Sequence, residues 1–201
     1  MSRPFILGLT GSIGMGKSAV ALMLRERGVP VFDADAAVHA LQGPGGALVP
    51  AIEAAFPGTT GPDGVHRQAL GAQVFGNAPA LARLEAIVHP AVGQMREAFL
   101  IEHAGEPLVV FDIPLLFEKG HQAGLDAVAV VSASADVQRA RVLARPGMTA
   151  EKFAQILGLQ VPDAEKRARA DFVIDTGVSL EETRTEVGAL VDRIRQKNPS
   201  A

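Results

Sequence analysis

The feature that most constrains the fold is the stretch GLTGSIGMGKSAV at residues 8–20. It has Gly11, four more residues, and then Gly16-Lys17-Ser18, which is the spacing of a phosphate-binding loop. An apolar run, PFILGLT, leads into the loop, and a segment with apolar residues at helical spacing follows it. VPVFDAD then has the pattern of a second strand. Strand, loop, helix and strand in this order predict a βαβ unit and a parallel sheet.

The glycines of this loop would let its backbone N–H groups converge on a polyphosphate. The helix that follows would aim the positive end of its dipole at the same anion. Lys17 would add a charge near the β- and γ-phosphates, and Ser18 would offer a hydroxyl ligand to Mg²⁺. A chance glycine-rich turn is the alternative, but the strand before the loop and the helix after it favour nucleotide binding. The residues predicted to bind ATP are Gly11, Ser12, Ile13, Gly14, Met15, Gly16, Lys17 and Ser18.

Three later segments, PLVVFD, LDAVAVVSAS and DFVIDT, also have the pattern of buried strands. A helical pattern over residues 79–100 contains Pro90, which should kink the helix or divide it in two. We therefore predict an α/β fold of three layers with about five parallel strands and two mainly helical additions. Its core would comprise residues 1–39, 105–144 and 170–201, with a helical insertion at 40–104 and a second helical segment at 145–169.

Composition narrows the possible functions. A chain of 201 residues suits one globular domain with an inserted subdomain, and its formal net charge of −3 argues against a general nucleic-acid binder. The absence of cysteine excludes disulfides, a cysteine nucleophile and thiolate metal sites. We find no signal-peptide pattern and no window approaching the roughly 20 apolar residues of a membrane span. We therefore expect a cytoplasmic protein without membrane or nucleic-acid partners.

Two of the predicted strands end in carboxylates, at the sheet edge where α/β proteins bind ligands. Asp33 is predicted to take a proton from an attacking hydroxyl, or to hold a metal through water, and Asp35 to cap the next helix. Asp112 resembles the aspartate near Mg²⁺ in P-loop proteins, with a strand-end cap as the alternative. The apolar IPLLFE that follows Asp112 could form a wall for an organic substrate.

The segment from residue 139 to 169 is rich in basic residues and predicts a flexible lid over phosphates. For each basic residue taken alone, a solvated helix face is the simpler interpretation. His89, which precedes Pro90, is interpreted from the sequence as a structural histidine. The basic residues of the segment are Arg139, Arg141, Arg145, Lys152, Lys166, Arg167 and Arg169.

Six motifs taken together resemble one family. GLTGSIGMGKS, VFDAD, HRQAL, LEAIVHP, DIPLLFE and AEKRARADFVID occur in this order, from about residue 5 to 190, and resemble the dephospho-CoA kinases. DIPLLFE and the His-Pro pair are more specific than the phosphate loop alone. The resemblance implies transfer of the γ-phosphoryl group of ATP to the ribose 3′-hydroxyl of dephospho-CoA, the last step of coenzyme A synthesis. It also implies a P-loop kinase core, a helical substrate domain and a lid.

The resemblance also implies roles for individual residues. Asp33 would be the general base, Lys17 would hold ATP, and Arg145 would reach the phosphates from the lid, which makes these three the predicted catalytic residues. Mg²⁺ would be the cofactor, with Ser18 and Asp112 as the predicted metal ligands. The residues predicted to bind dephospho-CoA are Asp33, Arg67, His89, Pro90, Asp112, Pro114, Leu115 and Leu116.

The chain departs from the family pattern at three positions. Ser12 stands where a glycine is common, Leu159 precedes Gln160 where an arginine is common, and Thr176 stands where an asparagine is usual. We therefore assign no adenine contact to Thr176. Two other functions stay open: a P-loop kinase acting on another small nucleotide or metabolite hydroxyl, and a non-catalytic nucleotide-binding switch. The sequence leaves a monomer and a homo-oligomer equally open.

Overall fold

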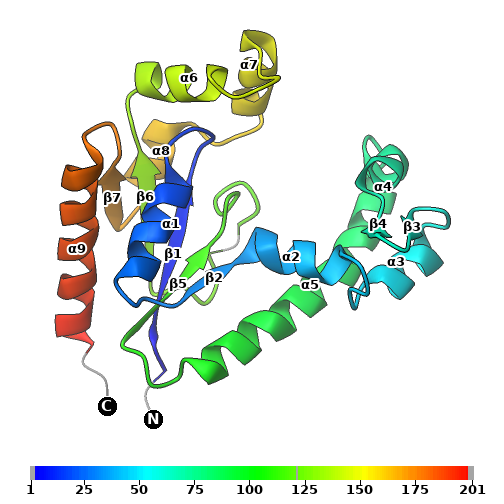
Figure 1. Ribbon diagram of the computed structural model, residues 1–201, viewed down its shortest axis with the longest axis horizontal. Helices are drawn as coiled ribbons and strands as arrows, with labels where there is room; N and C mark the ends of the chain where they lie inside the picture. The colour runs from blue at the N-terminus through cyan, green and yellow to red at the C-terminus, as the bar shows by residue number, and fades with distance from the viewer. Residues whose placement is uncertain (1–2, 121, 199–201) are drawn as a thin grey trace. The chain divides into compact units, whose positions relative to one another are not determined.

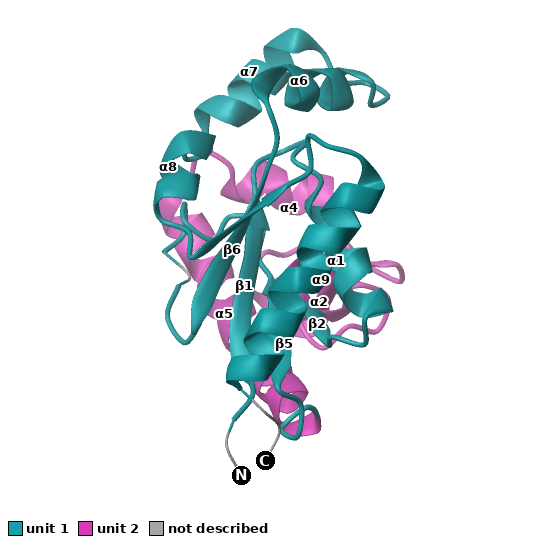
Figure 2. Ribbon diagram, turned by 90° about the vertical axis from the view of Figure 1, so that its left-hand side faces the viewer, with its two compact units in different colours: residues 1–32, 103–201 teal, residues 33–102 magenta. Residues whose placement is uncertain are grey.

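The computed structural model describes residues 3–120 and 122–198, and the chain divides into two compact units. Unit 1 contains the chain up to Phe32 and from His103 onward, and unit 2 contains Asp33–Glu102 (Figure 2). Among the described residues, no helix is both long and apolar enough to cross a membrane.

The centre of unit 1 is a five-stranded sheet with the order β2-β5-β1-β6-β7 (Figure 1). β1 runs parallel to both β5 and β6, and β6 runs parallel to β7, which confirms the predicted parallel sheet. Leu7 of β1 is in register with Val110 on one side and Ala127 on the other. The strands are β1 (Phe5–Gly11), β2 (Val31–Asp33), β5 (Leu108–Asp112), β6 (Ala127–Ser132) and β7 (Phe172–Asp175).

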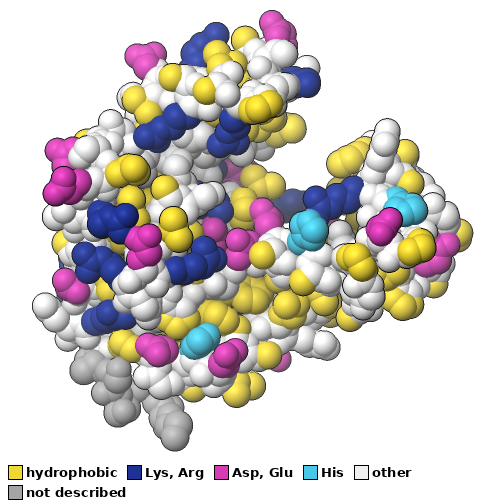
Figure 3. All heavy atoms as spheres, in the orientation of Figure 1, with side chains coloured by type: hydrophobic (Ala, Val, Ile, Leu, Met, Phe, Trp, Pro, Cys, Tyr) yellow, Lys and Arg dark blue, Asp and Glu magenta, His cyan; other side chains and the backbone are white. Residues whose placement is uncertain are grey.

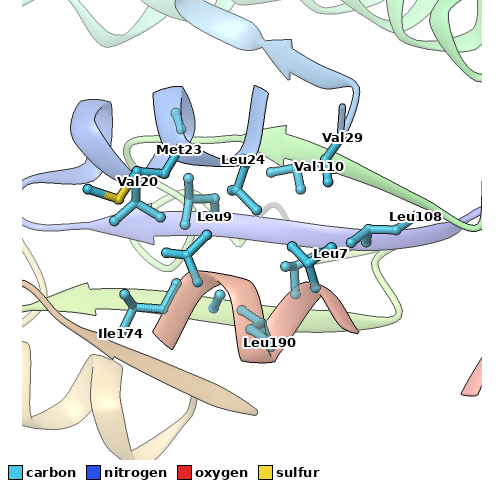
Figure 4. Packing of buried hydrophobic residues seen from close by; sticks show 14 of the residues in the cluster. Leu7, Leu9, Val20, Met23, Leu24, Val29, Leu108, Val110, Ile174 and Leu190 are labelled. Atoms are coloured by element: carbon cyan, nitrogen blue, oxygen red, sulfur yellow. The ribbon is translucent and has the colours of Figure 1, made fainter. Parts of the chain in front are cut away.

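The main core lies between this sheet and two helices, α1 (Lys17–Glu26) and α9 (Leu180–Lys197). Figure 4 shows Leu7 and Leu9 of β1 among apolar side chains from both helices, and neither leucine is exposed. Burying one leucine side chain in this way contributes about 1.5–3 kcal/mol to folding. Ser179 and Glu182 form the capping box that starts α9.

Three shorter helices complete unit 1: α6 (Ala135–Leu143), α7 (Ala150–Gly158) and α8 (Asp163–Ala168). The hydroxyl of Ser134 caps α6 by accepting from the backbone N–H of Val137. α8 contacts β6 and lies on the opposite side of the sheet from α1 and α9 (Figure 2). Unit 1 therefore has the three-layer arrangement that the sequence predicts.

Unit 2 has a small apolar core of its own, in which Ile52 and Phe56 are almost completely buried. It also contains a hairpin of two-residue strands, which are too short to give a periodic signal in the sequence. Glu53 accepts hydrogen bonds from the backbone N–H groups of Gly58 and Thr60 and so supports this turn. The elements are α2 (Ala34–Gln42), α3 (Val49–Ala55), β3 (Thr60–Gly61), β4 (Gly64–Val65), α4 (Arg67–Val74) and α5 (Ala78–Glu102).

Pro90 does not divide the long helix of unit 2, so that alternative of the prediction is wrong. α5 runs through Pro90 as one helix of 25 residues. A proline inside a helix removes one backbone hydrogen bond and costs about 3 kcal/mol or more. Apolar residues on both sides of it, including Val88 and Ala91, pack against the core of unit 2. This packing supports the helix on both sides of the proline.

Candidate active site

The glycine loop connects β1 to α1 and has the backbone geometry that a phosphate site needs. Gly14 and Gly16 have φ values of 78° and 85°, a left-handed conformation that favours glycine. A Cβ atom on Gly14 would lie 2.4 Å from Cγ2 of Val142, so the space also excludes a side chain. The glycine spacing in the sequence thus corresponds to real conformational and steric requirements.

Several backbone N–H groups of the loop remain available to a ligand. The N–H of Met15 closes a turn on the carbonyl of Ser12 at 3.1 Å. Among the turn, loop and side-chain hydrogen bonds of the described residues, none uses the N–H groups of Gly14 or Gly16. The N–H groups of Lys17 and Ser18 belong to the first turn of α1, where a helix has no internal acceptors. Converging N–H groups at a helix N-terminus form an anion site.

Lys17 and Asp112, both predicted to be functional, form an ion pair. Their side chains are 18% and 6% exposed, so the pair is largely shielded from water. The sheet topology explains the contact, because β5 lies directly beside β1 and both end at the same edge. Phosphate oxygens entering the loop would compete with Asp112 for the ammonium group of Lys17.

The oxygen donors near the loop fit a magnesium ion that arrives with a nucleotide. Ser18 is exposed at the start of α1, and Asp112 lies at the end of the neighbouring strand β5. Across residues 3–120 and 122–198, no three His, Cys, Asp or Glu side chains gather into a metal site. Mg²⁺ commonly takes one or two protein oxygens and completes its shell with phosphates and water. The predicted ligands Ser18 and Asp112 are of this kind.

The loop after β5 presents one of its two predicted leucines and buries the other. Pro114 accepts a hydrogen bond from Oγ1 of Thr10 at 3.2 Å, which ties the loop to the end of β1. Leu115 is 39% exposed, whereas Leu116 is fully buried and lies close to Gly8. Only the Leu115 side chain is presented to solvent, and the substrate-binding role of both leucines stays a prediction that follows from the resemblance. The sequence shows only that the run is apolar, and the packing of the loop decides which leucine faces inward.

Its place in the basic segment suggested that Lys166 is a lid cation, but the structure shows that it is not. It is completely buried on α8 and pairs with Oε1 of Glu118 at 2.7 Å. The same oxygen accepts from the backbone N–H of Val161 at 3.0 Å. Burial by itself raises the pKa of Glu118, but the hydrogen bonds from Lys166 and Val161 and the charge of Lys166 outweigh it, so this pKa lies below its ordinary value. The pair fixes the last turn of α8 to the end of the DIPLLFE motif.

Two further arginines of the basic segment also make structural contacts. Arg169 lies over the ring of Phe117 at 4.5 Å, and Arg141 donates to the backbone carbonyl of Thr176 at 2.6 Å. Arg145, the predicted catalytic lid residue, is exposed and follows α6. Figure 3 shows Lys and Arg side chains gathered over the region of α6 and α7. The lid segment thus combines anchoring cations with exposed ones.

Gln160 connects the lid segment to the phosphate loop, a contact the sequence reasoning missed. Its Oε1 accepts from the backbone N–H of Ile13 at 3.1 Å. The preceding residue, Leu159, ends α7 and is 83% exposed. The departure from the family pattern at Leu159 therefore lies beside a residue that touches the loop.

Unit 2 has a pocket of roughly 700 Å³ that brings Asp33 and Arg67 together. Asp33 is the N-cap of α2, because its Oδ1 accepts from the backbone N–H of Ala36 at 2.9 Å. The prediction that Asp35 is this cap is wrong, since Asp35 lies within the first turn. His39 also lines the pocket, and its spacing of four from Asp35 on one helix was the signal that could have identified it.

The remaining predicted residues of the helical region lie elsewhere in unit 2. His89 and Pro90 are exposed on α5 and are not among the residues that line the pocket of Asp33 and Arg67. Their assignment to substrate binding stays a prediction that follows from the resemblance alone.

Comparisons with known proteins agree with this geometry. A sequence model of the family described as dephospho-CoA kinase matches residues 5–182. A dephospho-CoA kinase of Novosphingobium aromaticivorans is 79% identical over 199 residues, which is 99% of each chain. The crystal structure of TT1252 from Thermus thermophilus is 35% identical, with a TM-score of 0.83 over 96% of this chain and 98% of that one.

A more distant structure supports the fold. The dephospho-CoA kinase from Campylobacter jejuni is 23% identical and has a TM-score of 0.64, covering 94% of this chain and 96% of its own. The family match, the full-length relative and the three-layer sheet with its glycine loop lead to one conclusion. The chain belongs to the dephospho-CoA kinase family.

Proposed function

We propose that this protein transfers the γ-phosphoryl group of Mg²⁺·ATP to the ribose 3′-hydroxyl of dephospho-CoA, which gives coenzyme A and ADP. Family membership supports the reaction, and the loop at residues 11–18 supports the nucleotide. The observation that carries the choice of acceptor is the pocket of unit 2, where a carboxylate, Asp33, and a guanidinium, Arg67, line one space. The carboxylate would deprotonate the acceptor hydroxyl, and the guanidinium would hold a phosphate of the acceptor.

Asp33 can act as a base while it caps a helix. Its Oδ1 is bonded to the N–H of Ala36, which leaves Oδ2 to accept the proton of the 3′-hydroxyl. The hydroxyl oxygen forms a bond to the γ-phosphorus, and the bond between that phosphorus and the β–γ bridging oxygen breaks. The electron pair of the broken bond leaves on ADP. The proposal requires the hydroxyl on Asp33 and the γ-phosphate on the loop to meet when both substrates are bound.

The loop residues would stabilise the charge that spreads over the transferring group. The N–H groups of Gly14 and Gly16 and the ammonium of Lys17 are preorganised donors for this charge. A bound Mg²⁺, with Ser18 and Asp112 as its protein ligands, would neutralise phosphate charge. Arg145 of the lid would add a further positive charge, and a closed lid would exclude the water that hydrolyses ATP.

Arg67 would select the acceptor through its phosphates. Dephospho-CoA carries a diphosphate, and a guanidinium binds phosphate oxygens through two parallel hydrogen bonds. His39, on the same pocket, could contribute a further donor. The rest of the lining consists of the polar residues Asp35 and Gln42 and of Ala36, Val38 and Ala40.

The test is an ADP-release assay with Mg²⁺·ATP, with and without dephospho-CoA, followed by mass spectrometry of the acceptor. The proposal predicts ADP formation that depends on the acceptor and a product heavier by one phosphoryl group. Lys17→Met is the control and should form neither. ADP release that ignores the acceptor would indicate a nucleotide-binding switch, and transfer only to another nucleotide or metabolite hydroxyl would assign a different acceptor.

Asp33→Asn separates the base from the helix cap, because asparagine caps a helix about as well as aspartate. We expect kcat to fall by roughly 10²–10⁴-fold, the range for general-base catalysis, with little change in melting temperature. Asp63→Asn is the control, because Asp63 is an exposed aspartate of unit 2 that does not line this pocket, and it should keep most of the activity. Near-normal turnover of Asp33→Asn with both substrates saturating would show that Asp33 is not the base.

A further inference from the structure

Two side chains outside the glycine motif hold peptide groups inside it. Oγ1 of Thr176, at the end of β7, donates to the carbonyl oxygen of Met15 at 2.7 Å. Nε2 of Gln138, on α6, donates to the carbonyl oxygen of Ile13 at 2.7 Å. Both side chains are buried, with Thr176 at 5% and Gln138 at 6% exposure. Hydrogen bonds in such shielded positions are stronger than their exposed equivalents.

These two carbonyl groups belong to the peptides that carry the N–H groups of Gly14 and Gly16. A trans peptide is planar, so its C=O and its N–H point in opposite directions. Holding the carbonyl of Ile13 on Gln138 therefore turns the N–H of Gly14 the other way. Holding the carbonyl of Met15 on Thr176 does the same for the N–H of Gly16. These are the loop N–H groups that have no partner among the turn, loop and side-chain hydrogen bonds of the described residues.

The hydroxyl of Thr176 is itself oriented by an arginine. Nη1 of Arg141 donates to Oγ1 at 3.2 Å, while Nη2 donates to the backbone carbonyl of Thr176 at 2.6 Å. Oγ1 has one hydrogen to give, and its two nearby acceptors are the carbonyls of Met15 at 2.7 Å and Ser132 at 3.2 Å. Because Arg141 donates to a lone pair of Oγ1, the hydroxyl hydrogen of Thr176 points to a carbonyl oxygen, and the carbonyl of Met15 is the nearer of the two.

Steric contact restricts the same peptide further. A Cβ atom on Gly16 would lie 3.1 Å from Oγ1 of Thr176, so this glycine packs directly on the threonine. The Met15 side chain is 2% exposed, and its sulfur accepts from the N–H of Ala133 at 3.2 Å. The loop peptides are therefore fixed by contacts from β6, α6 and the end of β7.

We propose that Thr176 and Gln138 are positioning residues for nucleotide binding, which hold the Met15 and Ile13 carbonyls outward so that the Gly16 and Gly14 N–H groups face the phosphates. Without these bonds, either peptide could rotate and turn a carbonyl oxygen toward an anion. The inference rests on the proposed function in one respect, namely that the loop binds ATP. It gives a role to Thr176, a position where this chain departs from the usual asparagine of the family.

The test compares Thr176→Val with Thr183→Val. Valine has the shape of threonine but no hydroxyl, and Thr183 is an equally buried threonine, at 2% exposure, whose Oγ1 donates to the carbonyl of Asp175 at 3.0 Å. Each variant loses one hydrogen bond to a backbone carbonyl, and Thr176→Val also removes the acceptor of Arg141 Nη1, so both should melt at a lower temperature and Thr176→Val at the lower of the two. Only Thr176→Val should bind ATP more weakly, by about tenfold, which corresponds to one hydrogen bond.

Calorimetric titration with Mg²⁺·ATP gives this affinity without any acceptor. Thr176→Ser retains the hydroxyl and should restore binding to near the wild-type value, and Gln138→Met should weaken binding about as much as Thr176→Val. In the ADP-release assay, KM for ATP should rise in both weakened variants while KM for dephospho-CoA stays unchanged. If Thr176→Val bound ATP as tightly as the wild type, or if Thr183→Val weakened binding equally, the positioning role would be wrong. A wild-type chain that bound no ATP would instead refute the proposed function, and this inference with it.

Discussion

The buried pair of Lys166 and Glu118 leads to a quantitative prediction for Lys166→Met. Methionine fills similar space but removes the charge, and it leaves Glu118 with a side chain only 11% exposed and without its cation. Breaking a buried ion pair by removing one partner costs about 3–5 kcal/mol, because the other charge stays uncompensated. For a chain of 150–250 residues, each kcal/mol lowers the melting temperature by about 2–4 °C. We therefore expect a decrease of roughly 6–20 °C.

The assay is differential scanning calorimetry at neutral pH, with a surface pair on the same helix as the control. Arg169 and Glu165 are 39% and 55% exposed and lie 3.2 Å apart at i, i+4 spacing. Such a pair contributes about 0.3–0.5 kcal/mol, so Glu165→Gln should lower the melting temperature by no more than about 2 °C.

A second variant tests the cause of the loss. Lys166→Met combined with Glu118→Leu removes both charges, and replacing a buried pair by apolar residues is often neutral or stabilising. The double variant should therefore recover most of the stability that Lys166→Met loses. If Lys166→Met were as mild as Glu165→Gln, or if the double variant were the less stable of the two, the uncompensated charge would not be the cause.

Three further predictions concern the acceptor, the response to acid, and the lid. Arg67→Met should raise KM for dephospho-CoA by about 10–100-fold and leave KM for ATP unchanged. This factor corresponds to the free energy of one hydrogen bond to a charged group. Burial raises the pKa of Asp126, but the hydrogen bonds from Arg3 and from the N–H of Ile6 lower it by more than burial raises it. The pKa of Asp126 therefore lies below its ordinary value. Asp126→Asn should thus be less stable than the wild type at neutral pH and should lose less stability as the pH falls from about 5 to about 3. Leu159→Arg should tighten ATP binding by a few fold at low ionic strength, and added salt should weaken this gain.

The results that would contradict these three predictions are specific. An Arg67→Met enzyme with an unchanged KM for dephospho-CoA would place the acceptor phosphates elsewhere. If Asp126→Asn and the wild type lost stability equally as the pH falls, Asp126 would not contribute to the acid response. The control for the lid is Leu180→Arg, since Leu180 is 69% exposed at the start of α9. If it tightened ATP binding as much as Leu159→Arg, net charge alone would explain the effect.

Local patterns in the sequence were sufficient for much of the fold. The glycine spacing between a strand and a helix predicted the loop, and the helices α6 and α9 begin at serine caps, Ser134 and Ser179, of the kind that a short sequence motif can identify. These features depend on a few consecutive residues and on backbone rules that hold in any protein. The long helix through Pro90 was harder to predict, because its continuity comes from packing on the core of unit 2.

Individual side chains of the candidate site were less predictable. The sequence predicted Asp35 as the helix cap, whereas the path of the backbone makes Asp33 the acceptor for the N–H of Ala36. Lys166 has the same local pattern as its exposed basic neighbours, yet it is buried against Glu118, 48 residues earlier in the chain. A local pattern carries no information about a partner so distant in sequence.

The sequence by itself determined the family, the phosphate loop and the parallel α/β sheet, because each depends on residue types at short, fixed spacings. The tertiary structure alone decided which residues support that loop. Thr176 reaches Met15 across 161 positions and Gln138 reaches Ile13 across 125, since β6, α6 and β7 converge beside the end of β1. Contacts between segments so far apart arise only when the sheet brings its strands together.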